Sequence, residues 1–254
     1  MEKDAYDPRL SQISTQWTLV FQLHKGEPGE VSAAQEALIL RYAGAVHRYL
    51  LAALRDPELA ADLDQEFALR FLRGDFHRAD PASGRFRDFV KRSLRNLMIN
   101  HLKSAKRRPL SGGGLPDEPA VSVETIETNF DVQFSESWRK ELMSRAWSAL
   151  LDLQTRTGQP YHSVLRCRVD HPELRSADLA VELSRQLGRE LTANNVRQAL
   201  LRARDKFVAY LLEEVSASLR HPSLDDIENE LIDLGLLEYC RPSLDRMRGD
   251  RAKS

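Results

Sequence analysis

Apolar positions recur at steps of three and four residues along most of the chain, which is the period of an amphipathic helix. Glycine is scarce in these stretches, and runs that alternate β-branched and polar residues are missing. Residues 109–136 interrupt the pattern, because they combine three glycines and three prolines with an excess of acids. We therefore expect an all-α protein whose two small helical domains are joined by a flexible acidic linker.

The expected parts follow from where the helical pattern starts and stops, and the length of 254 residues suits two domains of modest size. In chain order we expect an N-terminal extension (1–30), a first helical domain (31–108), the flexible linker (109–136), a second helical domain (137–216) and a C-terminal tail with a short helix (217–254).

Residues 56–74 carry the punctuation of a single helix, with Asp56 as the N-cap, Pro57 at the first helical position and Gly74 as the stop. Every fourth residue then forms an apolar stripe that we expect to pack inward, namely Leu59, Leu63, Phe67 and Phe71. A second face mixes acid and amide with leucine, at Asp62, Gln65, Leu69 and Leu72. This face indicates either a protein-binding surface or a second core contact.

Residues 85–108 form a basic amphipathic helix. We expect its inward face to hold Phe86, Val90, Leu94, Leu97 and His101. The opposite face is a stripe of cations with two amides and an aromatic ring, at Arg85, Phe89, Arg92, Asn96, Asn100 and Lys103. Cations neutralise phosphates, Asn reads an adenine edge, and an exposed ring stacks on an unpaired base. The stripe suits single-stranded or opening DNA; the alternative is a solvated charge run with Phe89 tucked against a neighbouring helix.

A helix-turn-helix pattern follows over residues 176–207. Ser176 is the expected cap of a first helix that buries Leu179, Ala180 and Leu183. After a turn region around Gly188, Thr192 is the expected cap of a second helix that buries Val196, Leu200, Ala203 and Phe207. In this motif the first exposed residues of the second helix meet base edges. Those residues are Asn194, Asn195, Arg197 and Gln198, with Arg202 and Arg204 nearer phosphate.

The sequence pattern of the C-terminal tail (217–254) predicts one short helix. Ser223 is its expected cap, Gly235 ends it, and the apolar positions between them are Leu224, Ile227, Leu231 and Leu234. This helix either docks back on the chain or binds a partner.

Charge is distributed in blocks, although the 37 basic and 38 acidic residues leave a net charge of only -1. Residues 85–108 contain many basic residues and a single acid, Asp88. Residues 109–138, in contrast, contain acids and no lysine or arginine. A basic block of this kind favours a nucleic-acid partner despite the neutral total.

Several classes of protein are excluded. No apolar run is long enough to span a membrane, and the start MEKDAYDPRL lacks the form of a signal peptide, so we expect a cytoplasmic protein with no membrane insertion. Cys167 and Cys240 lack zinc-finger spacing and are expected to be ordinary buried thiols. The histidines are scattered and catalytic motifs are missing, so we expect no enzyme activity, no catalytic residues, no metal and no cofactor.

The order of these parts resembles the bacterial RNA polymerase sigma factors of the extracytoplasmic-function group. The resemblance rests on A-D-L-D-Q-E-F (61–67), on G-R-F-R-D-F-V-K-R-S-L-R-N-L-M-I-N (84–100), and on the helix-turn-helix that ends R-A-R (202–204). It covers sigma region two at residues 31–108 and sigma region four at residues 137–215. Phe89 stands where the family commonly has Trp, and Asn100 where it commonly has Asp.

The resemblance implies a non-enzymatic initiation factor. Its expected partners are core RNA polymerase, promoter DNA and an anti-sigma factor. The polymerase-binding residues it implies are Asp62, Gln65, Glu66 and Leu69. It places the minus-ten contacts on the basic stripe from Arg85 to Lys103, and the minus-thirty-five contacts at Asn194, Asn195, Arg197, Gln198 and Arg202. The main alternative is a free-standing helix-turn-helix regulator that binds duplex DNA; an all-α enzyme is a third hypothesis.

Overall fold

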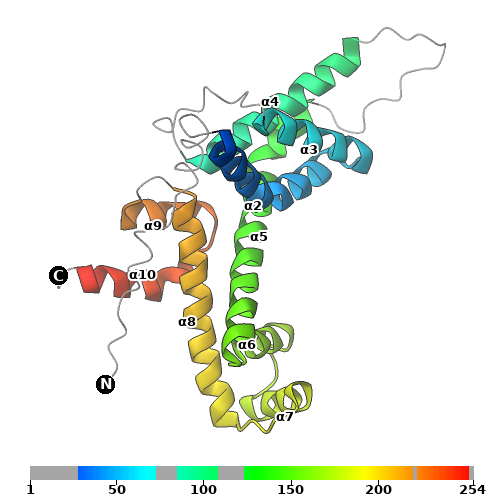
Figure 1. Ribbon diagram of the computed structural model, residues 1–254. Helices are drawn as coiled ribbons and strands as arrows, with labels where there is room; N and C mark the ends of the chain where they lie inside the picture. Colours follow the sequence, from blue (N-terminus) through cyan, green and yellow to red (C-terminus); the bar gives the residue numbers. More distant parts are fainter. Residues whose placement is uncertain (1–27, 73–84, 108–122, 220–221, 252–254) are drawn as a thin grey trace. The chain divides into compact units, whose positions relative to one another are not determined.

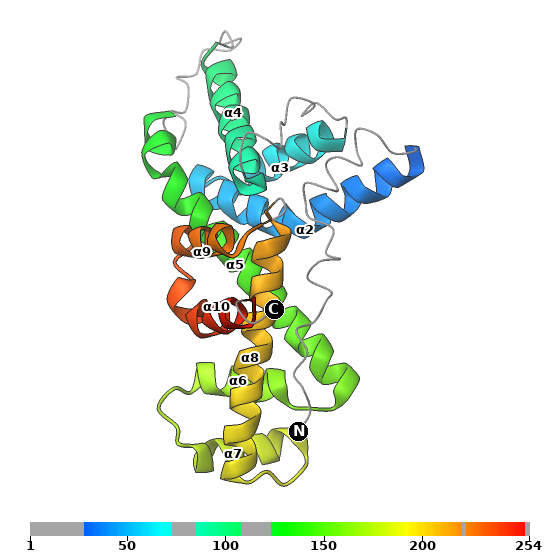
Figure 2. The same ribbon diagram turned by 90° about the vertical axis from the view of Figure 1, so that its left-hand side faces the viewer.

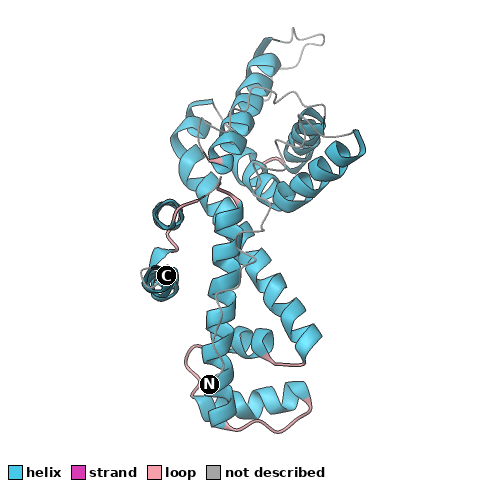
Figure 3. Ribbon diagram, turned by 60° about the vertical axis from the view of Figure 1, so that its left-hand side comes forward, coloured by secondary structure: helices cyan, strands magenta, loops and turns pink. Residues whose placement is uncertain are grey.

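The computed structural model describes residues 28–72, 85–107, 123–219 and 222–251. All the regular secondary structure in these ranges is helical, as Figure 3 shows, so the expectation of an all-α fold is confirmed. None of the described helices is long and apolar enough to cross a membrane. The expected N-terminal extension lies almost entirely outside the described residues.

Nine helices account for the described ranges, and Figure 1 labels them along the chain. They are α2 (Pro28–Leu54), α3 (Pro57–Leu72), α4 (Phe86–Arg107), α5 (Val123–Thr157), α6 (Tyr161–Asp170), α7 (Ser176–Leu187), α8 (Ala193–Ala217), α9 (Leu224–Asp233) and α10 (Leu237–Arg251).

The chain divides into two compact units. The first comprises Met1–Glu141 and Ser216–Asp226, and the second comprises Leu142–Val215 and Ile227–Ser254. Helix α5 therefore contributes its first part to one unit and its last part to the other.

Aromatic side chains form the centre of the first unit, where α2, α3 and α4 pack together. The rings of Tyr42 and Trp138 are stacked, with centroids 4.4 Å apart and planes inclined by 7°. Phe86 lies 5.2 Å from Tyr42 and 6.3 Å from Trp138. All three side chains are buried, so the start of α4 rests on rings supplied by α2 and α5.

The first part of α5 corrects the expected linker. Residues 123–136, which we expected to be flexible, are helical, and Phe130 and Phe134 are buried. Together with Trp138 these rings recur every four residues, which places them on one face of a helix against the first unit. The glycines and prolines that suggested a linker precede residue 123, and residues 108–122 lie outside the described part of the chain.

Helices α4 and α5 lie antiparallel where their side chains meet. Arg87 donates a hydrogen bond to the Ser135 hydroxyl at 3.2 Å, and the Lys91 ammonium lies 2.8 Å from the Asp131 carboxylate. A step of four residues forward on α4 is thus matched by a step of four backward on α5. The acids of the expected linker therefore include one that pairs with the basic helix.

The second unit is built around α8. Leu142, Ala146 and Leu150 of α5 are buried, and the Arg145 guanidinium lies 2.9 Å from the Glu214 carboxylate of α8. Trp147 of α5 contacts Phe207 of α8 with ring centroids 4.9 Å apart. Helices α6 and α7 pack on each other beside this pair. This arrangement fixes the first turns of α8 at one end of the unit.

The tail packs against its own chain. The Tyr239 ring of α10 lies 6.0 Å from Phe207, and the Arg246 guanidinium lies 3.0 Å from the Asp205 carboxylate of α8. Helix α10 lies beside α8 in both Figure 1 and Figure 2. Helix α10, which the sequence pattern did not predict, therefore docks back on α8. The expected tail helix is α9, and because its four apolar positions are buried it also packs on its own chain.

Local features of the tail match the sequence pattern. The Asp226 carboxylate accepts bonds from the Ser223 amide and hydroxyl at 2.9 and 2.6 Å, and the Ser223 hydroxyl accepts one from the Asp226 amide at 3.1 Å. Gly235 has φ 65° and ends α9. All four apolar positions of the expected helix are buried. Both cysteines are free and buried as expected, and burial raises the pKa of Cys240 to about 12.

Candidate nucleic-acid and protein interfaces

The start of α3 is held as the sequence predicts. The Asp56 carboxylate accepts hydrogen bonds from the backbone N–H groups of Glu58 and Leu59 at 3.0 and 3.1 Å, and α3 begins at Pro57. On the inward stripe Leu63, Phe67 and Phe71 are buried, and Leu59 is half-buried. Because this stripe is anchored, the orientation of the opposite face is set.

The opposite face of α3 is exposed. Asp62 and Gln65 are exposed, and the Leu69 side chain is 46% accessible, so Leu69 is not the second core contact that the sequence left open. Glu66 is half-buried, and its carboxylate accepts a hydrogen bond from Arg70 at 2.6 Å. The Leu72 side chain lies outside what the structure describes. An exposed leucine between an acid and an amide is the composition of a protein-binding surface.

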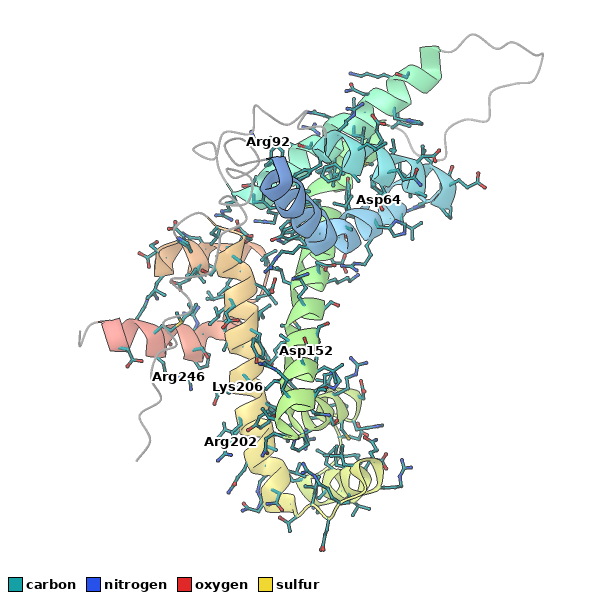
Figure 4. The ribbon with its side chains drawn as sticks, viewed as in Figure 1. Asp64, Arg92, Asp152, Arg202, Lys206 and Arg246 are labelled. Atoms are coloured by element: carbon teal, nitrogen blue, oxygen red, sulfur yellow. The ribbon has the colours of Figure 1, made fainter. Side chains whose placement is uncertain are left out.

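An apolar cavity of about 170 Å³ adjoins this face, and the sequence pattern did not indicate it. Tyr42, Phe67 and Phe86 are among its lining residues, as are Asp64 and Gln65 of α3. Figure 4 labels Asp64, whose carboxylate lies 3.3 Å from the His47 imidazole of α2. Burial raises the pKa of Asp64, although the neighbouring His47 opposes that shift.

The inward face of α4 differs from the expectation at one residue. Phe86, Val90, Leu94 and Leu97 are buried as expected, but His101 is exposed. The buried stripe continues at steps of four through Met98 and Leu102. Each such step turns the face by about 40° around the helix axis, so by the end of α4 the packed side has moved away from His101.

The outward face of α4 presents amides and cations along its length. Arg92, Asn96, Asn100 and Lys103 are exposed, whereas Arg85 and Phe89 are half-buried. Arg92, labelled in Figure 4, donates a long hydrogen bond of 3.4 Å to the Asp88 carbonyl. The Phe89 ring lies 6.1 Å from Phe86 and is partly accessible, which is intermediate between the two interpretations of this residue.

The helix-turn-helix pattern forms two helices, with one change at the first cap. Helix α7 buries Leu179, Ala180 and Leu183 as expected. Its N-cap, however, is Arg175 and not Ser176, and the Asp178 carboxylate accepts a bond from the Arg175 amide at 3.3 Å. Because Asp178 stands three residues after Arg175, its carboxylate can reach back to that amide, and Ser176 falls inside the first turn.

The turn between the two helices is tied to α7. Gly188 ends α7 in the left-handed region, with φ 62°. The Ser184 hydroxyl donates a hydrogen bond to the Ala180 carbonyl at 2.6 Å and accepts one from the Leu191 amide at 2.9 Å. This bridge holds the end of the turn against α7. Because Leu191 directly precedes the cap of α8, the bridge also positions the start of α8.

Helix α8 begins with a reciprocal cap. The Thr192 hydroxyl accepts a hydrogen bond from the Asn195 amide at 3.1 Å, which confirms Thr192 as the expected cap. In return the Asn195 side-chain oxygen accepts from the Thr192 amide at 3.0 Å and from its hydroxyl at 2.7 Å. A carbonyl oxygen has two lone pairs, so both are in use. Asn195 then offers an outside partner only its N–H donors.

The remaining expected contacts on α8 lie on its exposed side. Val196, Leu200, Ala203 and Phe207 are buried, which turns the intervening positions outward. The exposed side chains are Asn194, Asn195, Arg197, Gln198, Arg202 and Arg204. The structure thus brings these residues together on the first turns of one helix.

Comparisons with known proteins identify one part of the chain. Residues 38–108 match the family model described as sigma-70 region 2. The match contains α3, α4 and the second part of α2, so it includes both the exposed face of α3 and the stripe of α4. A search of curated proteins and a search of solved structures find no match.

Proposed function

We propose that this chain is a sigma factor of the sigma-70 family, of the extracytoplasmic-function group, with a role in transcription initiation. The proposal is supported by the match of residues 38–108 to the family model described as sigma-70 region 2. In this proposal it binds core RNA polymerase in the cytoplasm and directs the enzyme to specific promoters. Region two opens the minus-ten element, and a region four formed by the helix-turn-helix reads the minus-thirty-five element.

The observation that carries the proposal is the stripe on α4, inside the sigma-70 region 2 match. Asn96 and Asn100 have exposed amides that find no hydrogen-bond partner among the described residues, and cations lie one turn away on either side. Amides are suited to base edges and cations to phosphates. We assign minus-ten contacts to Arg85, Phe89, Arg92, Asn96, Asn100 and Lys103.

We assign polymerase binding to the exposed face of α3. Asp62, Gln65 and Leu69 lie on that face, and Glu66 lies between them with its carboxylate on Arg70. This combination of an accessible leucine with charged and amide neighbours supports a surface that buries a small apolar centre inside a polar rim.

We assign minus-thirty-five contacts to Asn194, Asn195, Arg197, Gln198 and Arg202. This assignment rests on helix geometry: α7, a turn and a capped α8 whose first exposed residues are amides and cations. A second helix of this kind enters the major groove and meets base edges with its first turns. An anti-sigma factor is a further proposed partner.

Transcription in vitro with purified core polymerase and a genomic promoter library tests the proposal directly. We expect the full chain to direct initiation at a small set of promoters, and core polymerase alone to give none of these transcripts. Tight and specific duplex binding by the chain without core polymerase, together with no transcription, would instead favour a free-standing regulator.

A binding assay locates the polymerase surface. We expect Asp62→Ala and Gln65→Ala each to weaken association with core polymerase, because both side chains are exposed and neither supports the core. Asp152→Ala is the matched control, since Asp152 is an exposed acid of the second unit. Normal association of both α3 variants would show that this interface is misplaced.

A further inference from the structure

A polar hollow of about 340 Å³ lies in the second unit, where the N-terminus of α6 and the turn before α8 meet the first turns of α8. Six of its lining residues carry polar groups that can donate hydrogen bonds, namely Gln159, Tyr161, Arg189, Asn195, Gln198 and Arg202. Figure 4 labels Arg202 on α8, one turn before Lys206. Neither the helix periodicity nor the charge blocks pointed to this hollow.

Two cations border the hollow from different elements. Arg189 belongs to the turn between α7 and α8, whereas Arg202 belongs to the third turn of α8. Both side chains are exposed, and neither forms an ion pair within the described ranges. Glu190 is the one acid among the lining residues, so the cations outnumber it.

Asn195 adds a donor and no acceptor. Both lone pairs of its side-chain oxygen accept from Thr192, at 3.0 and 2.7 Å. Reading adenine requires an amide that donates to N7 and accepts from N6 at the same time. With its oxygen committed to the cap, Asn195 is matched to an acceptor-only group, and phosphate oxygens are such a group.

We infer that this hollow seats a backbone phosphate of duplex DNA, held by Arg189 from one side, by Arg202 from the other and by the Asn195 amide N–H groups. The inference rests on the proposed role of region four and refines it. Arg197 and Gln198 read base edges, whereas Asn195 and Arg202 fix the register of α8 on the DNA backbone. Arg189 and the hollow are contacts beyond those that the family resemblance supplied.

Salt dependence of binding tests the inference with the full chain. The probe is a short random-sequence duplex, and the affinity is measured over a series of salt concentrations. Each lost phosphate contact lowers the slope of log K against log salt by about 0.9. We expect the Arg189→Ala, Arg202→Ala double variant to lose about 0.9 in all, because both arginines hold the same phosphate, and each single variant to lose part of that amount.

Arg241→Ala is the matched control, because Arg241 is an exposed arginine of the same unit that does not line the hollow. We expect an unchanged slope for it. Unchanged slopes for the two hollow variants as well would overturn the inference. This readout needs neither core polymerase nor a known promoter, so its failure is distinct from failure of the proposed sigma function.

Asn195→Asp separates the cap from the DNA contact. Asp226 performs the same capping role in α9 with a carboxylate, so the Asn195→Asp change keeps the cap, while it removes the N–H donors and adds a negative charge that repels phosphate. We expect α-helical content to be unchanged by circular dichroism and binding to weaken alike on random and promoter duplexes. A changed preference at a single base pair with normal random-duplex binding would mean that Asn195 reads a base.

A final arm distinguishes DNA phosphate from a free anion. Inorganic phosphate is added at constant ionic strength, and the melting temperature of the chain is followed. We expect no difference between the wild type and the Arg189→Ala, Arg202→Ala double variant. A rise for the wild type alone, with duplex slopes that the two changes leave unaltered, would show a site for a free anion and overturn the DNA assignment.

Discussion

Helices α4 and α8 both carry amides and cations on an exposed face above a buried apolar stripe, but they use their amides differently. On α4, Asn96 and Asn100 lie in the helix interior, where their backbone groups are already bonded and their side chains find no partner in the described ranges. On α8, Asn195 lies in the first turn and gives its oxygen to the cap. The position of an amide along a helix therefore decides which half of its hydrogen-bonding capacity is left for an outside partner.

The two helices also differ in their aromatic content. Helix α4 holds Phe89 half-exposed among its cations, whereas the exposed first turns of α8 hold no ring. A ring stacks on unpaired bases, and amides and guanidinium groups read paired ones. The proposed function calls for such a difference, because it assigns opened DNA to α4 and duplex DNA to α8.

The largest expected effect comes from removing the ring on which the start of α4 packs. Trp138→Ala removes a fully buried ring that stacks on Tyr42 and contacts Phe86, so the free energy of unfolding should fall by about 3–5 kcal/mol. Urea denaturation followed by fluorescence and circular dichroism measures this loss. Val132→Ala is the control on the same helix, because the Val132 side chain is 73% exposed. A loss below about 1 kcal/mol for Trp138→Ala would show that α5 does not carry the core of the first unit.

Phe89→Ala tests whether α4 contributes to promoter opening more than to closed-complex formation. We expect promoter opening to weaken by about 1–3 kcal/mol, the typical contribution of one base stacked on an aromatic side chain. Closed-complex formation should change less. Permanganate reactivity of promoter thymines measures opening, and a footprint at low temperature measures the closed complex. Equal losses in both steps would mean that Phe89 acts through its contact with Phe86.

Arg197→Ala tests the duplex-reading side of the comparison. If Arg197 touches a base, discrimination at one promoter position should relax by about 1–3 kcal/mol. Competition binding of the polymerase complex to single-base promoter variants measures this. The informative partner is Arg202→Ala, which should weaken all sequences alike; the two arginines exchange roles if the results are reversed.

The smallest expected effect concerns pH and the tail. Hydrogen bonds from the Ser223 hydroxyl and amide hold the pKa of Asp226 below its usual range. A carboxyl group with a lowered folded pKa stabilises the fold above its unfolded pKa, and this contribution is lost as the pH falls through the folded pKa. Unfolding followed at pH values below about 4 should therefore show a smaller pH dependence for Asp226→Asn than for the wild type. The effect is slight because Asp226 is exposed; identical curves would mean that the cap contributes nothing to stability.

Local patterns predicted much of this molecule correctly. The caps at Asp56, Thr192 and Ser223 and the apolar stripes of α3, α7 and α8 were readable because each depends on residues within one or two turns. The assignment of Ser176 as a cap was wrong, since Asp178 favours a start one residue earlier. The expected linker was wrong over residues 123–136, because acids and nearby glycines outweighed three rings spaced by four.

The sequence by itself determined the helical state of α3, α4, α7, α8 and α9, where several of these helices start, and which face of each is apolar, because periodicity and capping act over a few residues. Only the tertiary structure decided that His101 is exposed, that Asp131 pairs with Lys91, and that Arg189 and Arg202 border one hollow. Those facts depend on how far a neighbouring helix extends and on which residues distant in the chain meet. Periodicity within one segment holds no information about either.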